Sequence, residues 1–150
     1  MQLLKNLPDG LIAVFAVILA AWITDIFAYF TGKLFGKHKL CEAISPKKTI
    51  EGSIGGVVFC VIIFTLYSLI IFNKSTPIHG YIFMIIASLI LSVIAQIGDL
   101  SMSLIKRKFG IKDFGSLFPG HGGVLDRFDS ILAVAPVFLI IVLVANYIIF

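Results

Sequence analysis

The residues best suited to chemistry gather in one stretch, residues 98–130, which lies between two long apolar segments. It carries half of the acidic residues in the chain: Asp99, Asp113, Asp126 and Asp129. It also carries five bases: Lys106, Arg107, Lys108, Lys112 and Arg127. Carboxylates can hold a divalent cation, whereas basic side chains and glycine amides can hold phosphate. We therefore expect the functional site in this stretch.

Two of the acids bracket the stretch, and their placement indicates a metal site. If the flanking segments are antiparallel neighbouring helices, Asp99 and Asp126 come together at one end of them. Mg²⁺ typically binds one or two carboxylates and completes its coordination shell with waters and substrate phosphates. Asp99 and Asp126 are therefore predicted metal ligands, with Asp129 as a third candidate. The alternative is that Asp126 or Asp129 caps the following helix, which leaves the other acid available for metal.

Two further segments could bind phosphate. The turn that contains His121, Gly122 and Gly123 could direct backbone N–H groups toward an anion, although taken alone it is better explained by ordinary turn formation. The segment at residues 45–52 combines adjacent lysines with hydroxyls and glycine, which suits a polyphosphate. Its candidate ligands are Ser45, Lys47, Lys48 and Thr49. The alternative is that these lysines only set membrane topology or contact anionic lipid.

The composition predicts that these side chains are positioned by membrane spans. The chain of 150 residues is 59% hydrophobic and only 13% charged, whereas soluble domains are about a quarter charged. An all-α polytopic integral membrane protein, folded as a single domain, is the expected class. The net charge of +4 is explained below by topology, so it does not indicate a nucleic-acid partner. Two cysteines and three scattered histidines favour neither a disulfide framework nor a zinc cluster.

Four apolar stretches are long enough to cross a bilayer, at residues 11–30, 54–72, 78–97 and 131–150. A tight turn is expected at 73–77, and long loops at 31–53 and 98–130. These two loops hold 10 of the 12 lysines and arginines. The positive-inside rule then places both loops in the cytoplasm and both termini outside.

Polar residues inside the spans extend the predicted site. Asp25 and Tyr29 are four residues apart and share a helix face; Asp25 either lines the site or is an acid at the headgroup level. A second polar stripe runs at helical spacing along the third span and beyond it. It could line a polar cavity or join helices by hydrogen bonds. Its members are Ser88, Ser92, Gln96, Asp99, Ser103 and Lys106 or Arg107.

Several motifs together resemble the phosphatidate cytidylyltransferase (CDP-diacylglycerol synthase) family. The longest is the pattern over residues 103–129, with Ser103-Leu104-Ile105-Lys106-Arg107, Lys112-Asp113, Pro119-Gly120-His121-Gly122-Gly123 and Asp126-Arg127-Phe128-Asp129. Upstream matches are Asp25 with Tyr29 and Gly32, the segment 44–52, and Ile97-Gly98-Asp99-Leu100. The resemblance covers residues 22–130, and so long a pattern is specific.

This resemblance implies transfer of a cytidylyl group from CTP to phosphatidate, which gives CDP-diacylglycerol and pyrophosphate. It implies Mg²⁺ as cofactor, a second cation such as K⁺, and a site at the cytoplasmic face of a bacterial-type plasma membrane. The implied catalytic residues are Asp99, Asp126, Lys106, Arg107 and Asp25. The implied substrate-binding residues are Ser45, Lys47, Lys48, Thr49, Ser103, Lys112, His121, Gly122, Gly123 and Arg127.

One feature departs from that family, whose members usually carry further spans before the segment equivalent to Asp25. The chain is therefore expected to be a short member, a fragment or one part of a split enzyme, acting as a homodimer or with a missing N-terminal half. Alternative functions are a non-catalytic membrane subunit, a CTP-dependent enzyme for another lipid phosphate, and a small channel or transporter.

Overall fold

The structure, a computed structural model, describes residues 10–71, 78–111, 113–115 and 125–149. In these ranges the chain forms four helices and a two-stranded antiparallel sheet. The helices are α2 (Gly10–Phe35), α3 (Ile50–Ile71), α4 (Ile78–Lys108) and α5 (Leu125–Ile149). The strands are β1 (Lys39–Cys41) and β2 (Ser45–Thr49). The all-α prediction is confirmed, with one small hairpin that it did not include.

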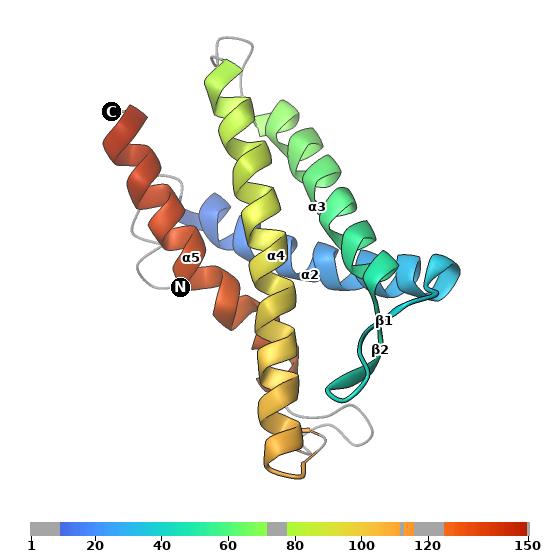
Figure 1. The fold of residues 1–150 in the computed structure, drawn as a ribbon. Coiled ribbons are helices and arrows are strands. Elements are labelled where there is room, and N and C mark those ends of the chain that lie inside the picture. The colour runs from blue at the N-terminus through green and yellow to red at the C-terminus, as the bar shows by residue number, and fades with distance from the viewer. Residues whose placement is uncertain (1–9, 72–77, 112, 116–124, 150) are drawn as a thin grey trace.

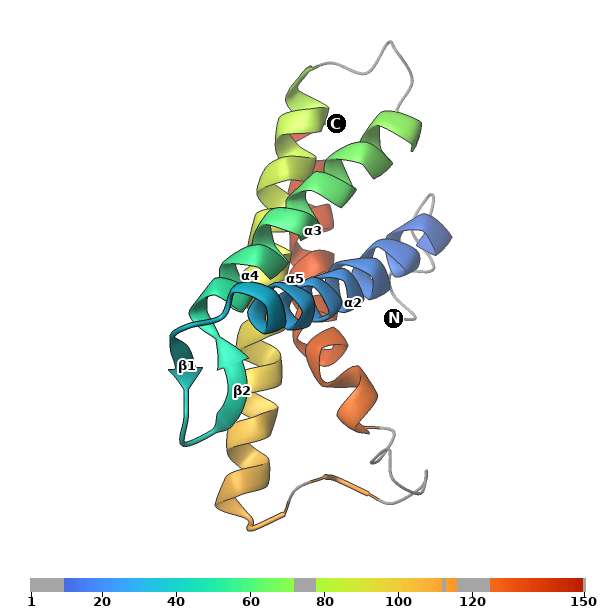
Figure 2. The ribbon, with the colours of Figure 1, turned by 90° about the vertical axis from the view of Figure 1, so that its right-hand side faces the viewer.

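The helices are arranged around α4, which lies between α3 and α5 (Figure 1). Helix α4 contacts each of the other three helices. Helix α2 crosses this group at a steep angle, and its C-terminal end leads into the hairpin (Figures 1 and 2). The hairpin lies alongside the C-terminal half of α4 (Figure 2). The basic and acidic segments of the chain are thereby gathered at one end of the helices.

Three helices within the described residues are long and apolar enough to cross a membrane: Val14–Phe35, Ile50–Tyr67 and Gly80–Lys108. The prediction of an integral membrane protein is confirmed. In α5 the apolar stretch is shorter and runs from Phe128 to Val144. Pro136 lies inside this helix, as neighbouring helices in a membrane allow.

The predicted loop at 98–130 is wrong at both of its ends, because α4 continues to Lys108 and α5 already begins at Leu125. The polar stripe of the third span is the reason: its helical spacing continues beyond the apolar segment. Gly110, two residues after the end of α4, terminates the helix with a φ of 67°, which favours glycine. The amides of Gly110 and Ile111 bind back to the carbonyls of Arg107 and Lys106 at 3.1 and 3.0 Å, which is a Schellman ending.

The predicted loop at 31–53 is also wrong, since it is replaced by the end of α2, the hairpin and the start of α3. In the hairpin, Lys39 is opposite Thr49. Thr49 also caps α3, because its Oγ1 accepts the Gly52 N–H at 3.1 Å. Glu51 in the first turn accepts the backbone N–H groups of Lys37 and His38. These bonds fix where the hairpin leaves the helices.

The core between α2, α3 and α4 combines apolar side chains such as Val17, Phe64 and Leu91 with small and hydroxyl-bearing ones. Thr24, Ser88 and Ser92 are fully buried, and Thr24 Oγ1 lies 3.0 Å from Ser92 Oγ. For Ser88 and Ser92, helix packing is therefore the correct interpretation of the stripe. Both cysteines are free, as expected, with Cys60 buried beside Thr24 and Ser92. The turn expected at 73–77 lies outside the described residues.

Glycine lets α2 and α3 approach closely beneath the hairpin. A Cβ on Gly52 would lie 2.6 Å from Ala28 O and 2.9 Å from Gly32 Cα. We expect Gly52→Ala to reduce the stability of the chain by about 1–3 kcal/mol, since overpacking has that effect in well-packed cores. Thermal unfolding in detergent measures it. Val58→Ala, on an exposed part of the same helix, is the control, and an equal melting temperature for both variants would contradict this packing.

Candidate active site

A pocket of about 250 Å³ collects the predicted phosphate-binding residues of the segment 45–52 together with Asp25, Gln96 and Asp99. Among the described residues of the stretch 98–130, Asp99 alone lines it. Helices α2, α3 and α4 and the hairpin all contribute to its wall. The lining residues are Asp25, Ala28, Tyr29, Leu40, Ser45, Lys47, Lys48, Thr49, Ser53, Gln96 and Asp99. One part of this wall is acidic and basic, and another, made by Ala28, Tyr29 and Leu40, is apolar. Such a pocket can accept a ligand that joins phosphates to an apolar group.

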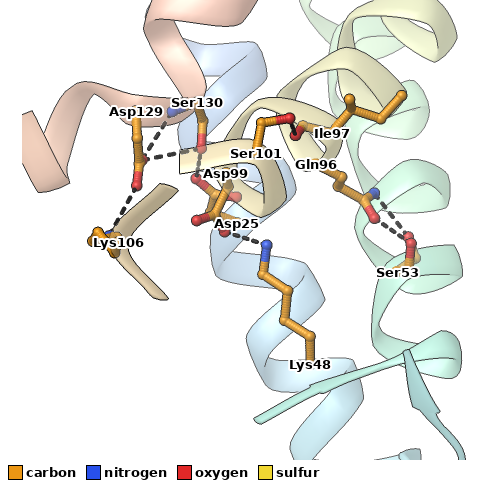
Figure 3. Close-up of polar contacts among 10 residues, drawn as sticks. All are labelled: Asp25, Lys48, Ser53, Gln96, Ile97, Asp99, Ser101, Lys106, Asp129 and Ser130. Carbon is orange, nitrogen blue, oxygen red and sulfur yellow. Dashed lines mark hydrogen bonds and ion pairs between the residues drawn. The ribbon is translucent and has the colours of Figure 1, made fainter. Parts of the chain in front are cut away.

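Lys48 and Asp99 form an ion pair within this pocket (Figure 3). Asp99 lies on α4, and Lys48 is carried to it by strand β2. Lys47, its neighbour, is more exposed and also lines the pocket. The interpretation of these lysines as topology signals alone is therefore insufficient. They are positioned to meet an anion beside a carboxylate.

The acids of α2 and α5 meet at Ser130. Ser130 Oγ donates a hydrogen bond to Asp25 Oδ2 at 2.7 Å, and the Ser130 N–H donates to Asp129 Oδ1 at 2.8 Å (Figure 3). Asp25 also lines the same pocket as Asp99 and Lys48. Asp25, Asp99 and Asp129, from three helices, therefore form one acidic cluster.

Lys106 joins the end of α4 to the start of α5. Its Nζ lies 2.9 Å from Asp126 Oδ1 and 3.9 Å from Asp129 Oδ2. Asp126 Oδ2 accepts the Phe114 N–H at 2.9 Å, and the Phe114 ring lies 5.4 Å from the Lys106 Nζ. The two helix ends meet through Lys106, which follows Asp99 by seven residues, so the predicted pairing of Asp99 with Asp126 stays a prediction. Asp126 accordingly orients both Lys106 and the chain that follows α4.

Gln96 and Ser53 close the pocket between α4 and α3. Gln96 Nε2 donates to Ser53 O at 3.1 Å, and Ser53 Oγ donates to Gln96 Oε1. Gln96 precedes Asp99 by one helical turn on the face that lines the pocket. In this part of α4 the polar stripe therefore lines the cavity, whereas at Ser88 and Ser92 it packs helices together.

Besides Lys106, two predicted site residues of α4 do not line the pocket. Arg107 is exposed, and its Nε donates to Ile44 O in the hairpin at 3.3 Å. It ties the tip of the hairpin to α4, and in this arrangement it stabilises the position of Lys47 and Lys48. Ser103 is half-buried and is not among the residues that line the pocket.

Apart from Arg107 and Ser103, the structure thus divides the predicted residues into three groups. Asp25, Asp99 and the four residues of the hairpin, Ser45, Lys47, Lys48 and Thr49, line the pocket. Lys106 and Asp126 form a neighbouring ion pair, and Asp129, a member of the acidic cluster, lies 3.9 Å from the Lys106 ammonium. Lys112, His121, Gly122, Gly123 and the Arg127 side chain lie outside the described residues.

Sequence reasoning missed three residues of the site, Ser130, Ser53 and Phe114. The only signal for Ser130 was its spacing, since it follows Asp126 by four residues and so lies on the same helix face. Ser53 contacts Gln96, which is 43 positions away in the chain. Such a contact between separate helices has no signal in the local sequence pattern.

The donor chemistry of the acidic cluster suits Mg²⁺, which prefers carboxylate oxygens. Within the described residues no group of three or more acids, histidines and cysteines has the spacing of a complete metal site. A complete protein cage is not needed for Mg²⁺, because waters and substrate phosphates usually supply the remaining ligands. Asp99 and Asp126 each contact a lysine, and a cation would compete with these ammonium groups.

Comparison with known proteins shows which family this chain resembles in sequence. The chain matches the model of the Cytidylyltransferase family over residues 1–145. It is 46% identical over 134 residues to the phosphatidate cytidylyltransferase of Bacillus subtilis (strain 168), covering 89% of this chain and 48% of that protein. The proteins of the same name in Staphylococcus saprophyticus and Staphylococcus aureus (strain COL) are 43% and 48% identical over 136 and 130 residues. They are matched over 51% and 48% of their own lengths, and over 91% and 85% of this chain. The chain therefore spans about half the length of these relatives.

Proposed function

Because this chain belongs to the Cytidylyltransferase family, we propose that it transfers a cytidylyl group from CTP to phosphatidate. A phosphate oxygen of phosphatidate attacks the α-phosphorus of CTP. The bond between the α-phosphorus and the oxygen that bridges to the β-phosphate breaks, so the products are CDP-diacylglycerol and pyrophosphate. The relatives named phosphatidate cytidylyltransferase support this choice of substrates. Phosphatidate is already an anion near neutral pH, so the reaction does not require a strong general base.

The observation that carries the proposal is the Lys48–Asp99 pair inside a pocket with an apolar wall. Both substrates are anionic and repel each other unless cationic groups lie between them. Lys48 and Lys47 would bind phosphates of CTP or the lipid headgroup. Tyr29, Ala28 and Leu40 offer apolar surface for the base or the glycerol end of the lipid. A ligand phosphate would release Lys48 from Asp99 and leave that carboxylate available for a cation.

Mg²⁺ is the proposed cofactor, with Asp99 and Asp126 as its ligands and Asp129 as a third candidate. The metal would neutralise phosphate charge as it develops during the transfer. Two neighbouring residues support this arrangement of carboxylates. Lys106 positions Asp126 through its ion pair, and Asp25 belongs to the cluster with Asp99 and Asp129. A second cation such as K⁺, suggested by the family resemblance, would also find carboxylate oxygens here.

The site is proposed to face the cytoplasm of a bacterial-type plasma membrane. Lys106, Arg107 and Lys108 form the last turn of α4, at the same end of the helices as the hairpin (Figure 2). The positive-inside rule places that end in the cytoplasm, where CTP is available, and both termini outside.

One experiment tests this reaction and separates it from the alternative functions. It measures pyrophosphate release from CTP by the purified chain in vesicles that contain phosphatidate and Mg²⁺. We expect release that depends on all three components. Activity only after addition of the N-terminal half of a relative would identify a split enzyme, and assembly of two copies would identify a homodimer. Release with another lipid phosphate but not with phosphatidate would contradict the proposed substrate.

A further inference from the structure

Ser130 is placed unusually among the acids, because it contacts two carboxylates from different helices. It is 3% exposed. Its hydroxyl oxygen lies 2.7 Å from Asp25 Oδ2 and 3.5 Å from Asp129 Oδ1. A hydroxyl has one proton to donate, so the shorter contact, to Asp25, receives it. Asp129 Oδ1 is held instead by the Ser130 backbone N–H at 2.8 Å.

The carboxylates of Asp25 and Asp129 must be held in place because their negative charges repel each other. Ser130 contacts both carboxylates at once, so these two like charges lie close together and repel each other. A largely buried carboxylate that loses its hydrogen-bond donor is destabilised. Without the Ser130 hydroxyl, the Asp25 carboxylate would turn away from Asp129. The separation of the acids would then vary.

We propose that Ser130 is a positioning residue that holds Asp25 beside Asp129 and so shapes the acidic cluster for a divalent cation. The inference rests on the cation-binding part of the proposed function, and it concerns a residue that none of the sequence motifs includes. Ser130 acts through Asp25. Groups that orient metal-binding carboxylates typically contribute 10–100-fold to metal affinity.

The test is direct binding of Mn²⁺, a paramagnetic substitute for Mg²⁺, to the purified chain in detergent. The free ion is measured by electron paramagnetic resonance. Ser130→Ala removes the hydroxyl, and Ser130→Cys removes the strong donor at nearly the same size. Both are expected to weaken Mn²⁺ binding by about tenfold, at the lower end of such effects. Thermal unfolding identifies any variant that does not fold, in which case the other Ser130 variant carries the measurement.

Ser101→Ala is the matched control. Ser101 is exposed, and its hydroxyl donates to Ile97 O of its own helix at 2.7 Å (Figure 3). The Ser101→Ala variant should bind Mn²⁺ with the same affinity as the unchanged chain. A double-mutant cycle then tests whether Ser130 acts through Asp25. In an Asp25→Asn background, Ser130→Ala should change the Mn²⁺ affinity by less than about twofold, because the carboxylate that it positions is already absent.

Three results would overturn the inference. They are unchanged affinity in both Ser130 variants, a full effect of Ser130→Ala in the Asp25→Asn background, and no Mn²⁺ binding by the unchanged chain. Failure of the proposed reaction is distinguishable from these. A chain that binds Mn²⁺ in a Ser130-dependent way but releases no pyrophosphate would contradict the reaction and support the positioning role.

Discussion

Replacing Asp99 by asparagine is expected to lower the rate of pyrophosphate release by about a hundred- to a thousandfold, since loss of metal-supplied charge stabilisation costs several kcal/mol. The substitution keeps the size of the side chain and removes its charge. It also removes the partner of Lys48, so the lysine should bind phosphate at least as well as before. We therefore expect the loss mainly in kcat and not in the KM for CTP.

Glu42→Gln is the control for Asp99→Asn. Glu42 lies between the two strands of the hairpin, is exposed and does not line the pocket. Glu42→Gln also removes one negative charge, but its rate of pyrophosphate release should stay within about twofold of that of the unchanged chain, because a distant exposed charge is screened by solvent. Steady-state assays at several Mg²⁺ and CTP concentrations separate the effect on kcat from the effect on the KM for CTP. Wild-type kcat in Asp99→Asn would refute its assignment as a ligand.

Lys106→Met is expected to produce the largest loss of stability. The side chains of Lys106 and Asp126 are only 12% and 11% exposed. Removing one partner of a buried ion pair typically costs about 3–5 kcal/mol, because the other charge is left uncompensated. Here Asp126 and Asp129 would both lose their contact with Lys106. Reversible unfolding in mixed detergent micelles measures the change.

Lys108→Met provides the comparison, because Lys108 lies in the same helical turn but is exposed. Its stability should change by less than about 0.5 kcal/mol, as for most surface substitutions. Asp126→Asn combined with Lys106→Met should recover part of the lost stability, because the buried charge is then removed as well. Equal stability of the two single lysine variants would show that the pair contributes little.

Much of the site was predictable from helical spacing. The four-residue step from Asp25 to Tyr29 places both on one face, and both line the pocket. The stripe through Gln96 and Asp99 likewise predicted a polar wall. The same stripe could have corrected the boundary of the third span, since it continued to Lys106 in helical register. From apolar content alone, the end of the third span was predicted too early, because a helix can extend beyond the membrane without ending.

The hairpin was not predictable in the same way. Residues 39–49 lack the alternating apolar and polar pattern that identifies strands. They are ordered by bonds from elsewhere, such as Glu51 to the His38 N–H and Arg107 to Ile44 O. The pairing of Lys48 with Asp99 depends on that hairpin reaching α4. Ser130 was missed for a related reason: one serine in a helix has no meaning until its distance to Asp25 is known.

The position of the transferred phosphorus in CTP tests the central claim most directly. The purified chain is incubated with phosphatidate vesicles, Mg²⁺ and CTP labelled at either its α- or its γ-phosphate, and the lipid is extracted. Cytidylyl transfer predicts label in the lipid from the α-position, with the γ-label recovered in pyrophosphate. Label entering the lipid from the γ-position, as a CTP-dependent lipid kinase would produce, would contradict the proposed reaction.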